Sequence, residues 1–202
     1  MTKRQSFKKD WQDIWNSKAL VSGERGFGLF IRCLKQLVPS EWLLIISRWR
    51  GIDERWDYRI VDVYVCVTTL FLLIILLWLD WPPELSASIA GFVLAGTIIN
   101  QANVVFLSKV FGAPRSIERT LLLFFFNAAQ VVLTFAILYR WKLPTLSAGK
   151  AITYAIQVFG TLDYPKSDAV DVIVNVQVAV DLFLFAIFLA FIVGNLGRPV
   201  RK

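Results

Sequence analysis

The residues of this chain that could do chemistry are gathered between Ser147 and Leu196. A 13-residue stretch of helical character, Ser147–Phe159, leads into the pentapeptide Thr161–Pro165, and a long apolar stretch follows. Backbone groups without helical hydrogen bonds are tolerated at membrane depth only where protein buries them or water lines them. A polar segment that ends in proline, placed between two apolar segments, therefore predicts a loop that dips into a membrane along a water-filled path.

The pentapeptide resembles the pore signature of the potassium-channel superfamily, in which a pore helix leads into Thr-Val/Leu-Gly-Tyr-Gly. Thr161, Leu162 and Tyr164 match this signature, whereas Asp163 and Pro165 replace its two glycines. The resemblance covers roughly residues 119–196. It implies an outer helix, a pore helix, a selectivity filter formed by these five residues and an inner helix, assembled with fourfold symmetry.

The two replaced glycines change what the resemblance implies. Proline fixes φ near −65°, so Pro165 cannot adopt the backbone angles that glycine permits. Asp163 adds a carboxylate, and a symmetric assembly would present a ring of these groups, which can hold monovalent or divalent cations. We therefore expect a cation filter based on Asp163 and do not expect potassium selectivity. Alternatively, the Asp163 carboxylate caps a turn by accepting hydrogen bonds from backbone amides.

Two polar residues of the last apolar stretch are candidates for supporting this filter. Gln177 and Asp181 are four residues apart and share one helix face. Polar groups are costly in lipid and usually face the helix bundle or water. Asp181 then either faces the pore or bonds to the pore helix at Tyr154 or Gln157, and we favour the second arrangement.

Below Asp181, the same stretch offers an apolar gate. Phe185, Leu189 and Ile192 recur at helical spacing, and an apolar ring can close a pore by excluding water. If the helix is rotated, Phe188 and Phe191 take this place.

The composition predicts an all-α membrane protein. Of 202 residues, 56% are hydrophobic and only 18% charged, against about 25% charged in ordinary soluble domains. Four stretches approach the ~20 residues that cross a bilayer, at 60–79, 86–107, 121–141 and 172–195. We expect four transmembrane helices, with the pore helix and loop re-entrant between the third and the fourth. The predicted units are 1–59 (amphipathic helices), 60–107 (a peripheral two-helix unit), 108–118 (a linker) and 119–202 (the pore module).

The basic residues predict an orientation, because cytoplasmic loops accumulate Lys and Arg. Twelve of the 22 Lys and Arg residues precede residue 60, three lie between the second and third stretches, and three follow the fourth. Only Arg140, Lys142, Lys150 and Lys166 fall on the other side. This distribution predicts an integral, multi-pass membrane protein with both termini in the cytoplasm.

The first 59 residues carry amphipathic patterns with Trp and basic residues. Such helices tend to lie in the headgroup plane of a bilayer. They could instead form a cytoplasmic layer under the membrane unit or a docking surface for a protein partner. The patterns leave all three arrangements open.

The residue types also exclude some functions. The chain has no histidine and only two cysteines, Cys33 and Cys66, so a zinc site and a histidine-based catalytic triad are not expected. We expect no enzyme, no cofactor other than permeant cations and no nucleic-acid partner, and no arginine-rich voltage sensor is visible. The alternative function is a non-conducting membrane scaffold or a channel accessory subunit, which Pro165 and Lys166 in the filter region favour.

Overall fold

A computed structural model of the chain describes residues 57–78, 81–111, 117–160 and 170–196, together with six positions before residue 35. This part is helical except for short turns. Its five helices are α4 (Asp57–Leu77), α5 (Pro83–Phe111), α6 (Ile117–Lys142), α7 (Ala148–Phe159) and α8 (Asp171–Leu196). The predicted amphipathic helices of residues 1–59, and any partner they bind, lie almost entirely outside the described residues.

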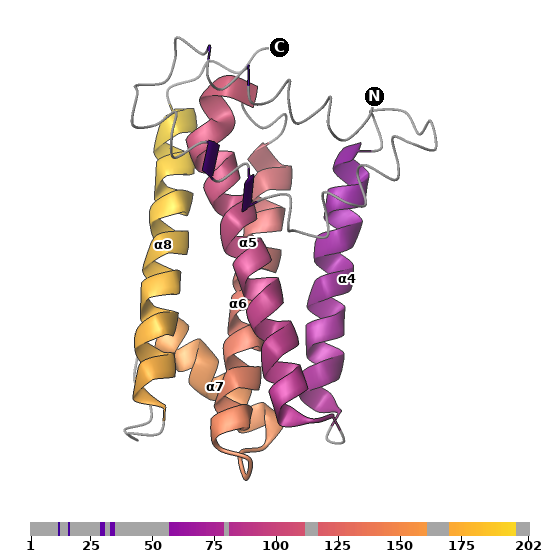
Figure 1. Cartoon of the computed structure of the whole chain (residues 1–202). Coiled ribbons are helices and arrows are strands. Elements are labelled where there is room, and N and C mark those ends of the chain that lie inside the picture. The colour runs from indigo at the N-terminus through magenta and orange to yellow at the C-terminus, as the bar shows by residue number, and fades with distance from the viewer. Residues whose placement is uncertain are drawn as a thin grey trace.

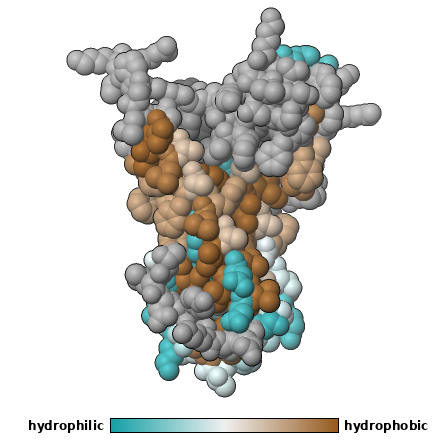
Figure 2. Space-filling view, turned by 90° about the vertical axis from the view of Figure 1, so that its left-hand side faces the viewer, coloured by the Kyte–Doolittle hydropathy of each residue, from teal (hydrophilic) through white to brown (hydrophobic). Residues whose placement is uncertain are grey.

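The four long helices run side by side with alternating direction, and α7 is a short helix at one end of the bundle (Figure 1). Helix α4 begins and α8 ends at the opposite end. Three helices are long and apolar enough to cross a membrane, over Pro83–Ala102, Arg119–Lys142 and Asp171–Ala190, and Val61–Leu77 is a shorter apolar helix. Hydrophobic residues cover the middle of the face in Figure 2, and hydrophilic ones gather toward one end. These features indicate a membrane protein.

The sequence-based prediction of helices agrees closely with the structure. Each of the four predicted apolar stretches falls on one long helix, and the 13-residue stretch forms α7 with Ser147 as its N-cap. Helix α5 continues to Phe111, so the break before α6 is shorter than the predicted linker 108–118. Pro82 and Pro83 separate α4 from α5 as expected, since proline is accommodated in the first turn of a helix.

Helix α6 is the centre of the bundle and packs against the other four helices. Its Val131, Phe135 and Tyr139 side chains are fully buried. They belong to a single hydrophobic core that also takes residues from α4, α5, α7 and α8. Helices α4 and α5, which correspond to the predicted peripheral pair, therefore pack on the same helix, α6, as α7 and α8.

Gln130 of α6 ties three helices together by hydrogen bonds. Its Nε2 donates to the Val65 carbonyl (3.1 Å) and to Thr68 Oγ1 (2.6 Å) on α4, and its Oε1 accepts from Thr97 Oγ1 (2.8 Å) on α5. Gln130 is buried, and a buried amide without partners is costly. These bonds fix the depth at which α4 and α5 pack against α6.

An ion pair joins α4 and α6 at the end of the bundle opposite α7. Arg119 Nη2 and Nε donate to the two carboxylate oxygens of Asp62, at 2.8 and 3.0 Å. Both side chains are about one third exposed, so the pair contributes little to the free energy of unfolding in contact with water. Its fork geometry nevertheless sets the relative orientation of the first turns of both helices.

Candidate functional site

Helix α7 is the element that the sequence marked as a pore helix. Ser147 caps its first turn, since Ser147 Oγ accepts a hydrogen bond from the Lys150 amide at 3.4 Å. The buried face carries small residues: Ala151 and Ala155 are fully buried and Val158 is 2% exposed. Small side chains allow α7 to approach α6 and α8 closely.

Helix α7 extends from the end of the bundle toward its middle. It starts just after the turn that follows α6, and the Phe159 ring in its last turn lies 5.3 Å from the Phe185 ring, centroid to centroid. Phe185 is the fifteenth of the 26 residues of α8, which places it about 21 Å along that helix at 1.5 Å per residue. From Gly160 the chain must therefore return about half the length of α8 to reach Val170.

The predicted filter lies on this return. Residues 161–169, and with them Thr161, Leu162, Asp163, Tyr164 and Pro165, lie outside the described residues. Both anchors of the segment are described: Gly160 caps α7 through a hydrogen bond to the Ile156 carbonyl at 2.8 Å, and Val170 is fully buried. Nine residues are more than enough to cover this separation, because an extended chain spans about 3.3 Å per residue.

A buried hydrogen-bond chain holds α7 against α6 and α8. The Gln177 side chain of α8 is fully buried. Its Nε2 donates to the Ala155 carbonyl of α7 (2.8 Å), and its Oε1 accepts from the Tyr139 hydroxyl of α6 (2.8 Å). Figure 1 shows these three helices meeting at the α7 end of the bundle. These hydrogen bonds fix the position of α7 relative to α6 and α8.

The predicted hydrogen bond of Asp181 to α7 is not found among the described residues, and the support of a filter by this helix face stays a prediction. Asp181 is 2% exposed, and neither of its carboxylate oxygens has a hydrogen-bond partner among the described residues. It does not bond to Tyr154 or Gln157, which are both half-buried on α7. Gln177, one turn closer to the start of α8, is at the depth of Ala155 and makes the contact.

The buried Asp181 carboxyl is the most unusual polar group of the bundle. A buried charge without a hydrogen-bond partner is strongly unfavourable. Thr134 Oγ1 on α6 is also buried without a partner. The Asp181 side chain faces the interior of this protomer.

The predicted gate residues lie on or beside the exposed face of α8. Phe185 and Leu189 are exposed (39% and 59%), and Ile192 is half-buried. Phe188, considered as a substitute, instead stacks on Phe124 of α6 with ring centroids 4.3 Å apart. Phe188 therefore contributes to packing, and a gate at Phe185, Leu189 and Ile192 stays a prediction.

Both α7 and α8 leave one face without a partner among the described residues. On α7, Thr153 is exposed and Ile156 is 50% exposed. On α8 the exposed positions recur every three or four residues and form a column: Asn175, Ala179, Leu182, Ala186, Leu189 and Val193. We call these residues the α8 column. It combines small residues with one amide, the composition that packs helices together in membranes.

No three described His, Cys, Asp or Glu residues are grouped so that they could hold a metal ion. Comparisons with models of protein families, with curated proteins and with solved structures give no match to this chain.

Proposed function

We propose that the chain is one subunit of a homo-oligomeric cation channel whose conduction path is formed by α7, residues 161–169 and α8. The observation that carries this proposal is the depth of α7. Its last turn lies beside Phe185, half way along a helix long enough to cross a membrane, while the chain resumes at the start of that helix. This arrangement supports a re-entrant loop.

The dipole of α7 supports a preference for cations. The C-terminal end of a helix carries a partial negative charge from its free carbonyl groups. In a re-entrant α7 this end lies at the centre of the membrane, where few water molecules compete for an ion. The filter residues, with Asp163 as the charged one, follow directly in the sequence.

The unpartnered faces support a closed assembly. One re-entrant segment cannot enclose a pore, and homo-oligomers usually have closed cyclic symmetry. The α8 column places the Asn175 amide on an exposed face of an apolar helix, and such a group in lipid would be costly. A neighbouring subunit or a water-filled path would satisfy it. The resemblance to potassium channels implies four subunits.

The proposed topology has four spans with both termini in the cytoplasm and α7 entering from outside. The shorter α4 reaches the lower limit of a spanning helix, since its apolar part Val61–Leu77 has 17 residues. An impermeant thiol reagent added outside intact cells should label Lys142→Cys, in the exposed end of α6, in a chain whose two native cysteines are replaced by serine. Lys109→Cys, near the end of α5, should stay unlabelled until the cells are permeabilised. The reverse pattern would invert the topology.

Conduction itself is tested on purified protein in planar bilayers. We expect single-channel currents whose reversal potential follows the cation gradient when potassium or sodium salts are replaced, and a tetramer by native mass spectrometry. A strict monomer would contradict the assembly. Tetramers without current in neutral, anionic or tensioned bilayers would favour the scaffold or accessory subunit.

A further inference from the structure

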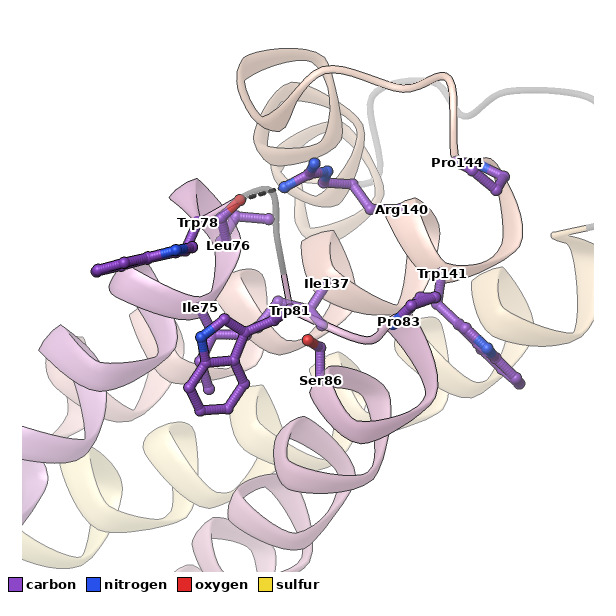
Figure 3. Close-up of a pocket in the computed structure, with 10 residues that line it drawn as sticks. All are labelled: Ile75, Leu76, Trp78, Trp81, Pro83, Ser86, Ile137, Arg140, Trp141 and Pro144. Atoms are coloured by element: carbon purple, nitrogen blue, oxygen red, sulfur yellow. Dashed lines mark hydrogen bonds between the residues drawn. The ribbon is translucent and has the colours of Figure 1, made fainter.

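A pocket of about 160 Å³ opens where α4 ends, α5 begins and α6 ends (Figure 3). It lies outside the proposed conduction path. Its lining includes Trp78, Trp81 and Trp141 together with Ser86 and Arg140, and the Trp81 ring lies between the other two tryptophans in Figure 3. Tryptophan is typical of the interface between lipid and water. The volume is about that of five water molecules in the liquid, at about 30 Å³ each, so a phosphate-sized group fits.

The Arg140 guanidinium supplies a positive charge that has no ion-pair partner among the described residues. One of its terminal nitrogens donates to the Leu76 carbonyl, as Figure 3 shows. Its Nε is buried without a hydrogen-bond partner, and no described carboxylate forms an ion pair with it. A guanidinium matches phosphate oxygens with two parallel hydrogen bonds. The chemistry of the pocket therefore calls for an anion of this type.

An apolar column on α4 leads to the pocket. Val63, Val67, Phe71, Ile74 and Trp78 follow one another at spacings of three or four residues, which places them on one helix face. All five are between 38% and 60% exposed. The column ends at Trp78 in the pocket wall, and Phe71 contacts the edge of Trp81 at 6.3 Å between centroids. A lipid whose phosphate lies in the pocket could place an acyl chain along this apolar face, whereas a free phosphate would make no contact with it.

We propose that this pocket binds the phosphate group of a glycerophospholipid, with one acyl chain of that lipid lying along the α4 column. Arg140 contacts the phosphate, and the indole rings surround the glycerol region. The part of the column from Val67 to Trp78 is long enough for one leaflet, because its 11 rises of about 1.5 Å add up to about 16 Å and a leaflet contributes about 15 Å of hydrocarbon. The site does not depend on ion conduction.

The test is a titration of the full-length protein in detergent with dioleoylphosphatidylglycerol, followed by native mass spectrometry. We expect one lipid per chain to bind before the others and Arg140→Gln to weaken this binding by about tenfold or more, since a hydrogen bond to a charged group is lost. Lys142→Gln is the matched control. Lys142 is exposed two residues away, with its ammonium over the Trp141 ring at 4.1 Å, and it does not line the pocket, so its loss should weaken binding much less than the loss of Arg140.

A second variant guards against a folding defect in Arg140→Gln. Ser86→Leu keeps the arginine and fills part of the pocket, and it should weaken lipid binding comparably while the thermal unfolding temperature stays near that of the wild type. Equal losses in Arg140→Gln and Lys142→Gln, or unchanged binding in Ser86→Leu, would overturn the site. Inorganic phosphate and dioleoylglycerol separate the two halves of the proposal: neither should displace the lipid at millimolar concentration. Displacement by phosphate alone would assign the pocket to a soluble anion instead.

Discussion

Gln177→Leu is expected to destabilise the protein by about 2 kcal/mol and to release α7 from the bundle. The substitution keeps the volume of the side chain close to the original but removes both hydrogen bonds of the buried amide, to Tyr139 and to the Ala155 carbonyl. Each lost partner leaves a buried polar group unpaired, at a cost of about 1–3 kcal/mol in general and of about 0.6 kcal/mol on average between helices in membranes. For two lost bonds the membrane average gives about 1.2 kcal/mol and the general range about 2–6 kcal/mol. Because Gln177 is fully buried, we expect about 2 kcal/mol.

Unfolding in mixed micelles gives the change in free energy, and hydrogen–deuterium exchange locates it. Peptides covering Ala148–Phe159 should exchange faster in Gln177→Leu, while those covering α4 should be unchanged. Asn175→Leu is the matched control, because the same amide is removed from an exposed position two residues away. Faster exchange in the control and not in Gln177→Leu would show that the Gln177 hydrogen bonds do not hold α7.

Tyr139→Phe separates the two bonds of Gln177. It removes only the hydroxyl and leaves the bond to Ala155 in place. Because Tyr139→Phe and Gln177→Leu both remove the bond between these side chains, the cost of the double variant should be less than the sum of the two single costs.

The sequence predicted the helices well because each apolar stretch is bounded by residues with a clear structural preference. Ser147 before α7 and Gly160 after it mark the ends of that helix, and the length of 12 residues shows that it cannot cross a bilayer. Helical spacing also identified the α8 face that carries Gln177 and Asp181. Spacing defines a face, however, and does not give the depth of one helix relative to another.

Because spacing gives no depth, the sequence could not show that Gln177, and not Asp181, makes the hydrogen bond to α7. A shift of one turn, about 5.4 Å, exchanges Asp181 for Gln177 as the residue beside α7, and the acceptor is the main-chain carbonyl of Ala155. Every residue has such a carbonyl, so side-chain types give no signal for it. The lipid pocket was missed for a related reason: Arg140 was counted only as a charge outside the membrane, and its neighbours come from three helices that are distant in sequence.

Asp163→Asn is expected to reduce the permeability of cations relative to anions by about tenfold or more in the proposed channel, and to weaken block by divalent cations. Two unit charges 4 Å apart interact by about 4 kcal/mol at an effective dielectric constant of 20, and a ring contributes one carboxylate from each subunit. Salt screens such charges poorly in a narrow path from which bulk water is excluded. Reversal potentials under a gradient of potassium chloride measure the change.

Asp171→Asn is the matched control for this variant. Asp171 is the exposed first residue of α8, eight positions from Asp163, and its substitution should alter only the conductance at low salt, where surface charge still concentrates cations. Replacing Asp163 and Pro165 together by glycine restores the signature of potassium channels and should shift selectivity toward potassium. If Asp163→Asn leaves reversal potentials and divalent block unchanged in intact tetramers, its carboxylate caps a turn. The carbonyl end of α7 is then the next source of negative potential to test, because the free carbonyl groups of its last turn carry a partial negative charge.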